Sequence, residues 1–214
     1  MTARPTRPET TMTDLEWVCA MQQRAGQSPL SHERCFCGAR LTHAHAMSCR
    51  LLRHRLIKHD VVVHRVARWL KERGIYCVRE LVVLSSGLAR IDILVRHTGV
   101  VYWLDVSITE PATATGLAAG AAVRALAAAR ARENSKRSEW TKRAEGDGKV
   151  VTVVPCVMET TSAVGKDFLD FIRNMEHATA NSLGARAAVL WQELSVAIHQ
   201  CNAAMLGEAI RRRR

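Results

Sequence analysis

Apolar residues recur at helical spacing before residue 75 and at strand-like spacing from there to about residue 109. We expect Asp14 to cap a helix over the apolar segment that follows it, which ends near Gly26 and Pro29. A basic amphipathic helix is predicted from Asp60 to Gly74. The apolar positions on its buried face are Val62, Val63, Val66, Trp69 and Leu70.

Three strand-like stretches follow, at residues 75–84, 89–95 and 100–109, and they are separated by turn-forming residues. The simplest arrangement is an antiparallel meander. Beyond Pro111 and Gly116, the Ala-rich residues 117–143 predict one long helix or two helices jointed at Gly120.

The last third of the chain predicts one strand and two helices. Residues 149–158 are apolar enough for a buried strand, and helices fit residues 166–177 and 183–210. Alternating strands and helices predict an α/β protein, with a mixed sheet that contains the meander and is flanked by helices. We expect a disordered lead-in at 1–13, a helix and Cys/His module at 14–59, a core at 60–177 and a C-terminal helix with a basic tail at 178–214.

The charge of the chain favours a polyanionic partner. The net charge is +11, and nine Lys or Arg face two acidic residues between Cys35 and Arg73. Nucleic acid is the first expectation and an acidic membrane surface the second. The chain contains neither an apolar run of ~18 residues nor an N-terminal apolar signal region, so we expect an intracellular or nuclear protein, not a secreted or membrane one. The candidate phosphate-binding residues are Arg50, Arg53, Arg55, Lys58, Arg65 and Arg68.

Seven cysteines, an odd number, favour metal ligation over a disulfide framework. Cys35, Cys37, His45 and Cys49 bring three thiolates and an imidazole into 15 residues, a ligand set that suits tetrahedral Zn²⁺. The fourth ligand is the open point, because His43, His54 or His59 is an alternative to His45. Four protein ligands leave no open coordination position on the zinc ion. We therefore predict that the zinc site stabilises the local structure and helps to orient nucleic acid, and does not catalyse a reaction.

Two aspartates face each other in the predicted meander. If the hairpin between residues 89–95 and 100–109 has a two- or four-residue loop, paired residue numbers add to 197, as do 92 and 105. Asp92 and Asp105 then lie opposite each other on one face, where two carboxylates repel unless a cation joins them. Mg²⁺ is the expected cation, since it combines one or two carboxylates with water and phosphate oxygens. The alternative is that one aspartate lies at a strand end or on the solvated face.

These segments resemble the C-terminal part of non-LTR retrotransposon polyproteins. The matching runs are RCFCGARLTHAHAMSC, KHDVVVHRVARWLKERG, RIDILV with VVYWLDVSITEP, and VVPCVMETTSAVG, within a resemblance that spans about Leu15 to Met205. In that family a Cys-Cys-His-Cys zinc knuckle precedes a restriction-like endonuclease of the PD-(D/E)XK nuclease fold.

The resemblance implies metal-ligating roles for Asp92 and Asp105. Ile91 replaces the family's proline before the first aspartate, and Ser107 stands where a lysine is expected. Many members take this lysine from the following helix, and the matching residue is Lys136. Glu80, on a neighbouring predicted strand, is a candidate third acidic residue.

The function implied by the resemblance is Mg²⁺-dependent nicking of double-stranded DNA, whose 3′ end then primes reverse transcription. Retroelement RNA is a further expected partner, and the reverse transcriptase portion would be encoded upstream. Two competing hypotheses are a catalytically inactive zinc-containing nucleic-acid-binding remnant and a purely structural zinc protein.

Overall fold

A computed structural model describes residues 10–27, 34–35, 37–84, 89–181, 184 and 186–211. The helices are α1 (Asp14–Arg24), α2 (His43–Ser48), α3 (His54–Glu72), α4 (Ala114–Ala118), α5 (Ala127–Gly146), α6 (Lys166–Ala178) and α7 (Ala187–Arg211). The strands are β1 (Tyr76–Val82), β2 (Arg90–His97), β3 (Val100–Thr109) and β4 (Thr152–Glu159). The predicted turn at 85–87, most of the lead-in and the end of the arginine tail lie outside the described residues.

The four strands form one mixed sheet in the order β1-β2-β3-β4. β1 pairs with β2 and β2 with β3 in antiparallel fashion, so the predicted meander is confirmed. β4 is parallel to β3, and Pro155 pairs in register with Asp105. Proline lacks the N–H of a ladder bond, and β4 accommodates it because it is an edge strand.

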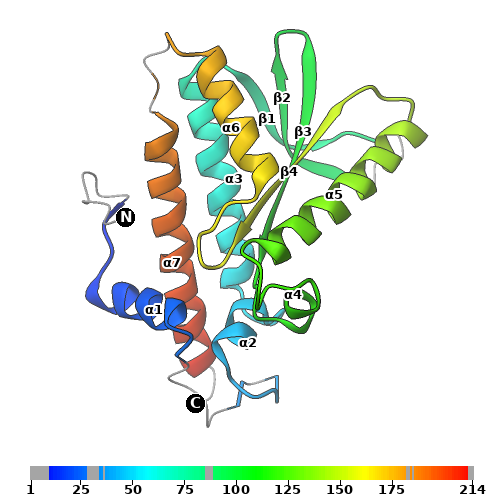
Figure 1. Cartoon of the computed structure of the whole chain (residues 1–214). Helices are drawn as coiled ribbons and strands as arrows, with labels where there is room; N and C mark the ends of the chain where they lie inside the picture. The colour runs from blue at the N-terminus through cyan, green and yellow to red at the C-terminus, as the bar shows by residue number, and fades with distance from the viewer. Residues whose placement is uncertain are drawn as a thin grey trace.

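Helices cover both faces of the sheet, as the α/β prediction requires. α3 and α6 lie along one face, with α7 packed on α3, and α5 runs across the other face (Figure 1). The strands alternate between the two layers: Ile93 and Leu104 join the core under α3 and α6, whereas Leu94 and Trp103 pack against Trp140 of α5. This alternation follows from the two-residue period of a strand.

The N-terminal module packs on the far end of α7. α1 crosses the lower part of α7 in Figure 1, and α2 lies beside the same end. Cys19, Leu41, Met47 and Leu52 share an apolar cluster with Met205, Leu206 and Ala209 of α7. The predicted boundary at residues 59 and 60 falls inside α3, a continuous helix that runs from this module into the main core.

One helix start differs from the sequence prediction, and the choice between one and two helices after Gly116 is decided for two. α3 begins at His54 rather than Asp60, because its first turns expose their apolar residues and so carry no amphipathic signal. The segment predicted at 117–143 is two helices, α4 and α5, separated by turns at 119–126. Gly120 has a φ of 91° and Leu126 a φ of 59°, so the helical path is interrupted at both ends of this turn.

None of the helices in the described part of the chain combines the length and apolarity needed to cross a bilayer.

Candidate functional sites

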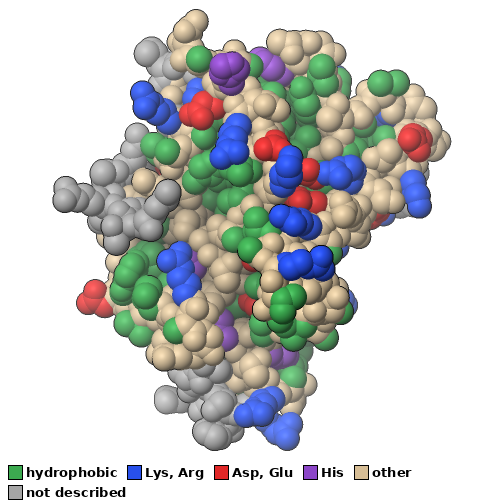
Figure 2. Space-filling model, in the orientation of Figure 1, with side chains coloured by type: hydrophobic (Ala, Val, Ile, Leu, Met, Phe, Trp, Pro, Cys, Tyr) green, Lys and Arg blue, Asp and Glu red, His purple; other side chains and the backbone are tan. Residues whose placement is uncertain are grey.

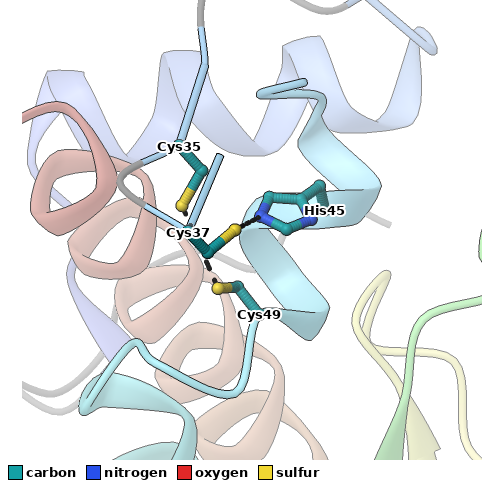
Figure 3. Close-up of side chains that lie close together, drawn as sticks. All are labelled: Cys35, Cys37, His45 and Cys49. Carbon is teal, nitrogen blue, oxygen red and sulfur yellow. Dashed lines mark hydrogen bonds between the residues drawn. The ribbon is translucent and has the colours of Figure 1, made fainter. Parts of the chain in front are cut away.

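The four predicted zinc ligands converge in space. Their ligand atoms all lie within 4.8 Å of one another, and the side chains point toward a common centre (Figure 3). Cys37 Sγ is 3.2 Å from His45 Nε2, and Cys35 Sγ is 4.0 Å from Cys49 Sγ. Donors bound to tetrahedral zinc at ~2.0–2.3 Å are separated by about 3.3–3.8 Å, so this arrangement fits the ion.

Local structure explains how a short segment brings these ligands together. Cys35 and Cys37 flank a tight turn in which the Gly38 N–H donates to the Cys35 carbonyl at 2.8 Å. Gly38 has a φ of 88°, a conformation that favours glycine. The Thr42 hydroxyl accepts from the His45 N–H and starts α2, which carries His45 in its first turn and ends at Cys49.

The pKa values of two cluster thiols are shifted in opposite directions. Burial raises the pKa of the Cys49 thiol to about 11, whereas a hydrogen bond from the Ala39 backbone lowers the pKa of Cys37. A bound Zn²⁺ holds such thiols in their thiolate form. The Cys₃His cluster is therefore a site that could bind zinc.

The alternative histidines are engaged elsewhere. His54 Nδ1 is 2.7 Å from the Glu208 carboxylate, and His59 Nε2 is 3.3 Å from Asp92 Oδ2. His43 lies outside the cluster, and both of its ring nitrogens are buried without a hydrogen-bond partner. The open choice of fourth ligand thus resolves to His45.

A second site lies where β2 and β3 separate. Ladder pairs such as Leu94↔Trp103 and Ile93↔Leu104 have residue numbers that add to 197, as predicted, and this ladder ends at Ile93↔Leu104. Asp92 and Asp105 are the next residues along the two strands. Beyond the ladder the Val106 N–H donates to Asp92 Oδ2 at 2.6 Å, so the aspartate side chain replaces a strand partner.

Asp105 is buried and only partly satisfied. Its Oδ1 accepts from Lys136 Nζ at 3.1 Å and from Trp140 Nε1 at 2.7 Å, both on α5. Its Oδ2 is buried with no hydrogen-bond partner. Burial is the main cause of a raised pKa at Asp105, and Asp92 adds to it, while Lys136 and Trp140 oppose it. An unpartnered carboxylate oxygen beside a second carboxylate is a donor set that fits a hard divalent cation.

His59 approaches this site from α3, on the other side of the sheet from α5. It lies in the second turn of α3, and its hydrogen bond to Asp92 raises its pKa to about 9. The imidazole is therefore a cation at neutral pH, and it offsets part of the negative charge at the two aspartates.

Both aspartates and His59 line a pocket of about 650 Å³. Five Lys or Arg and three Asp or Glu line it, and the basic residues are Arg50, Arg55, Lys58, Arg132 and Lys136. The lining therefore combines both aspartates with an excess of basic side chains.

Some of the predicted phosphate-binding residues make internal contacts. Lys58 lines the pocket, but its ammonium donates to Asn202 Oδ1 at 2.9 Å, and burial lowers its pKa to about 8. Arg65 and Arg68 pair with Glu193 of α7 and do not line the pocket. Arg53 is exposed at the N-terminal end of α3, near the pocket-lining Arg50 and Arg55.

Glu80 is not brought to the site. It lies on β1 across from the Asp92 position, is exposed with a φ of 53°, and does not line the pocket. The geometry therefore gives no support to its predicted role as a third acidic residue.

Sequence reasoning assigned no role beside the aspartates to three residues that the structure places there. His59 appeared only as an alternative zinc ligand, and Trp140, which donates to Asp105, had no assigned role. Arg132 donates from Nε to the Ser107 hydroxyl at 2.9 Å, so a guanidinium lies beside the residue that replaces the expected lysine. The only signal for Arg132 and Trp140 was their spacing of four residues on either side of Lys136.

Opposite charges alternate on another part of the surface. Figure 2 shows Lys and Arg interspersed with Asp and Glu near α5 and α6, where Arg137 pairs with Asp167 and Lys166 with Asp170. Exposed pairs of this kind contribute little stability. Because positive and negative side chains alternate there, this part of the surface does not form a uniformly positive patch.

A scan against protein-family models finds no match, and a search of curated proteins likewise matches none.

Proposed function

We propose that the chain is a metal-dependent DNA endonuclease domain with a zinc-binding module. The observation that carries this proposal is the buried Asp105 carboxylate, whose Oδ2 has no hydrogen-bond partner in a pocket shared with Asp92 and five basic residues. A buried polar atom without a partner is costly, and a cation at this position would compensate it.

Asp92 and Asp105 are the residues that would hold Mg²⁺ in this proposal. The ion supplies polarisation of the phosphoryl oxygen and lowers the pKa of a bound water. The chain's own contribution is positioning. Lys136 and Trp140 fix one oxygen of Asp105, and the Val106 N–H fixes one oxygen of Asp92.

Two cations are placed to bind the substrate. Lys136 lies against Asp105 and faces the region where negative charge grows on the phosphate in the transition state. Arg132, held by Ser107, provides a planar donor for a phosphate oxygen at the position of the missing lysine. Arg50, Arg53 and Arg55 extend this positive region along the DNA backbone.

The finer fold assignment belongs to the same proposal. A mixed sheet with helices on both faces, an acidic pair on adjacent strands and a lysine on the next helix are compatible with the restriction-like endonuclease core that the sequence resembles. A Cys₃His module in front of it follows the order seen in non-LTR retrotransposon proteins. The expected partners are double-stranded DNA, element RNA and an associated reverse transcriptase, with nicking in the nucleus.

Plasmid nicking tests this function. The wild-type chain is expected to convert supercoiled plasmid to the open circle with Mg²⁺ or Mn²⁺. Asp92→Asn and Asp105→Asn keep an oxygen for their hydrogen bonds but remove the charge, and each is expected to lower the rate at least ~100-fold. Asp170→Asn, an exposed change on α6, is the matched control. Equal nicking by all three variants contradicts the metal-binding roles.

A second candidate is a nucleic-acid-binding module without catalysis, favoured by Ser107 in place of lysine. It predicts salt-sensitive DNA binding, with no cleavage under any divalent metal. Nicking that requires both aspartates excludes it.

A further inference from the structure

Two aliphatic side chains are exposed beside the pocket. Leu56 is 64% exposed and lines the pocket, and Ile57, the next residue on α3, is 45% exposed. Arg55 precedes them and lines the same pocket, and Leu51, in the turn before α3, is also exposed. We call Leu56 and Ile57 the aliphatic rim.

The rim lies close to the proposed reaction centre. Leu56 and His59 are three residues apart on α3, so they share a face and their Cβ atoms are separated by about 5–6 Å. His59 contacts Asp92. If a DNA phosphate binds at Asp92 and Asp105, the two base pairs on either side of that phosphate therefore lie next to Leu56.

The surroundings of the rim favour nucleic acid over another occupant. Arg50, Arg53 and Arg55 directly precede it in the sequence, and no acidic residue occurs between Cys35 and His59. A protein partner with an ordinary mixed surface gains little from such a concentration of arginine. An apolar side chain framed by phosphate-binding residues instead matches the wedge with which some proteins unstack and kink a duplex.

From this geometry we infer that Leu56 inserts between two base pairs next to the phosphate in the pocket, with Ile57 supporting it. The inference rests on the proposed function, because it requires DNA in the pocket. Unstacking costs least at pyrimidine–purine steps, so the preferred substrate is duplex DNA that contains TA or CA steps, and stiff A-tracts are disfavoured.

Base unstacking can be measured without cleavage. The full zinc-containing chain, with Ca²⁺ in place of Mg²⁺ so that DNA can bind without being cut, is titrated into a duplex of repeated TA steps that carries 2-aminopurine at several adenines. We expect the 2-aminopurine fluorescence to rise about twofold or more at saturation, and Leu56→Ala to lose at least half of this rise while the Kd changes less than about threefold. Leu56→Met should retain most of the rise.

Val150→Ala is the control, because Val150 is an aliphatic residue that is 98% exposed outside the pocket. It should behave as wild type, and circular dichroism should be unchanged in all variants. Binding without a fluorescence rise, or a rise that Leu56→Ala does not reduce, overturns the wedge alone. If the fluorescence rise depends on Leu56 but the wild-type chain does not nick plasmid, the wedge is supported and the proposed endonuclease function is rejected. A wild-type chain that does not bind DNA overturns both.

Discussion

The Cys/His cluster and the carboxylate pocket adjoin the same end of α3, but their residues come together in different ways. The cluster draws its four ligands from 15 consecutive residues and closes around one centre. The pocket assembles Asp92, Asp105, Lys136 and His59 from two strands and two helices, and it leaves a carboxylate oxygen without a partner. A site closed by four protein ligands suits a structural ion, whereas an open one can admit a substrate. The comparison separates the part that stabilises the fold from the part that we propose for catalysis.

Loss of a cluster ligand should have the largest effect. In Cys49→Ser we expect bound zinc to fall from about one per chain to near zero, and the module to lose its order, because metal binding supplies most of the folding free energy of so small a segment. Elemental analysis and amide hydrogen exchange over residues 34–53 measure both. Cys201→Ser, on α7 outside the cluster, should keep its zinc. Full zinc occupancy in Cys49→Ser contradicts the assignment.

Trp140→Phe tests the support of the pocket. It removes the hydrogen bond to Asp105 Oδ1 and part of the contact with Trp103, so we expect a loss of about 2–4 kcal/mol in the free energy of unfolding. Urea denaturation measures it. Trp17→Phe, on the exposed side of α1, is the control and should change stability by less than ~1 kcal/mol. Equal losses in the two variants show that Trp140 does not hold Asp105.

The pH dependence of stability should reveal the cost of the Asp105 charge. Burial raises the folded-state pKa of Asp105 above its unfolded value of 3.8, so the folded state binds the proton more tightly. Its contribution is therefore most favourable below pH 3.8 and is lost as the pH rises toward the folded pKa. The wild type should lose stability relative to Asp105→Asn over this range, by at most ~1.4 kcal/mol per pH unit.

Denaturation at a series of pH values, without added divalent metal, measures that difference. Asp170→Asn corrects for the loss of one carboxylate from the sequence. A wild-type advantage over Asp105→Asn that grows with pH would contradict the account, since it would mean that Asp105 is stabilised as an anion even without a metal.

The smallest expected effect is that of His59. Its pKa is raised from 6.5 to about 9 by Asp92, so its stabilisation is complete below pH 6.5 and is lost as the pH rises to about 9. The side chain is 34% exposed, and solvent screening keeps the effect below ~1 kcal/mol. NMR titration should find a His59 pKa that falls toward 6.5 in Asp92→Asn. An identical titration in both proteins shows that the pair does not form in solution.

Short-range patterns in the sequence predicted the sheet hairpin and the cluster. Thr98 and Gly99 form a two-residue turn, which fixed the register of β2 and β3 as far as Ile93↔Leu104, one residue short of the predicted Asp92–Asp105 pair. The Cys and His spacing alone identified the cluster, because ligands close in sequence can meet without knowledge of the tertiary fold.

Tertiary contacts account for what the sequence did not reveal. The first turns of α3 were missed because Leu56 and Ile57 are exposed and break the apolar periodicity. The partner of Asp92 is His59 on another layer, and the donor to Ser107 is Arg132, 25 residues away. No local pattern links such residues. Likewise, Arg65 and Arg68 belong to a basic stretch, but only the packing of α7 shows that Glu193 pairs with them.

Mn²⁺ binding to the zinc-loaded chain, followed by electron paramagnetic resonance, tests most directly whether Asp92 and Asp105 hold a divalent cation. The account predicts one Mn²⁺ per wild-type chain, affinity at least ~10-fold weaker in Asp92→Asn and Asp105→Asn, and wild-type affinity in Asp170→Asn. Equal Mn²⁺ affinity in all four proteins would contradict it.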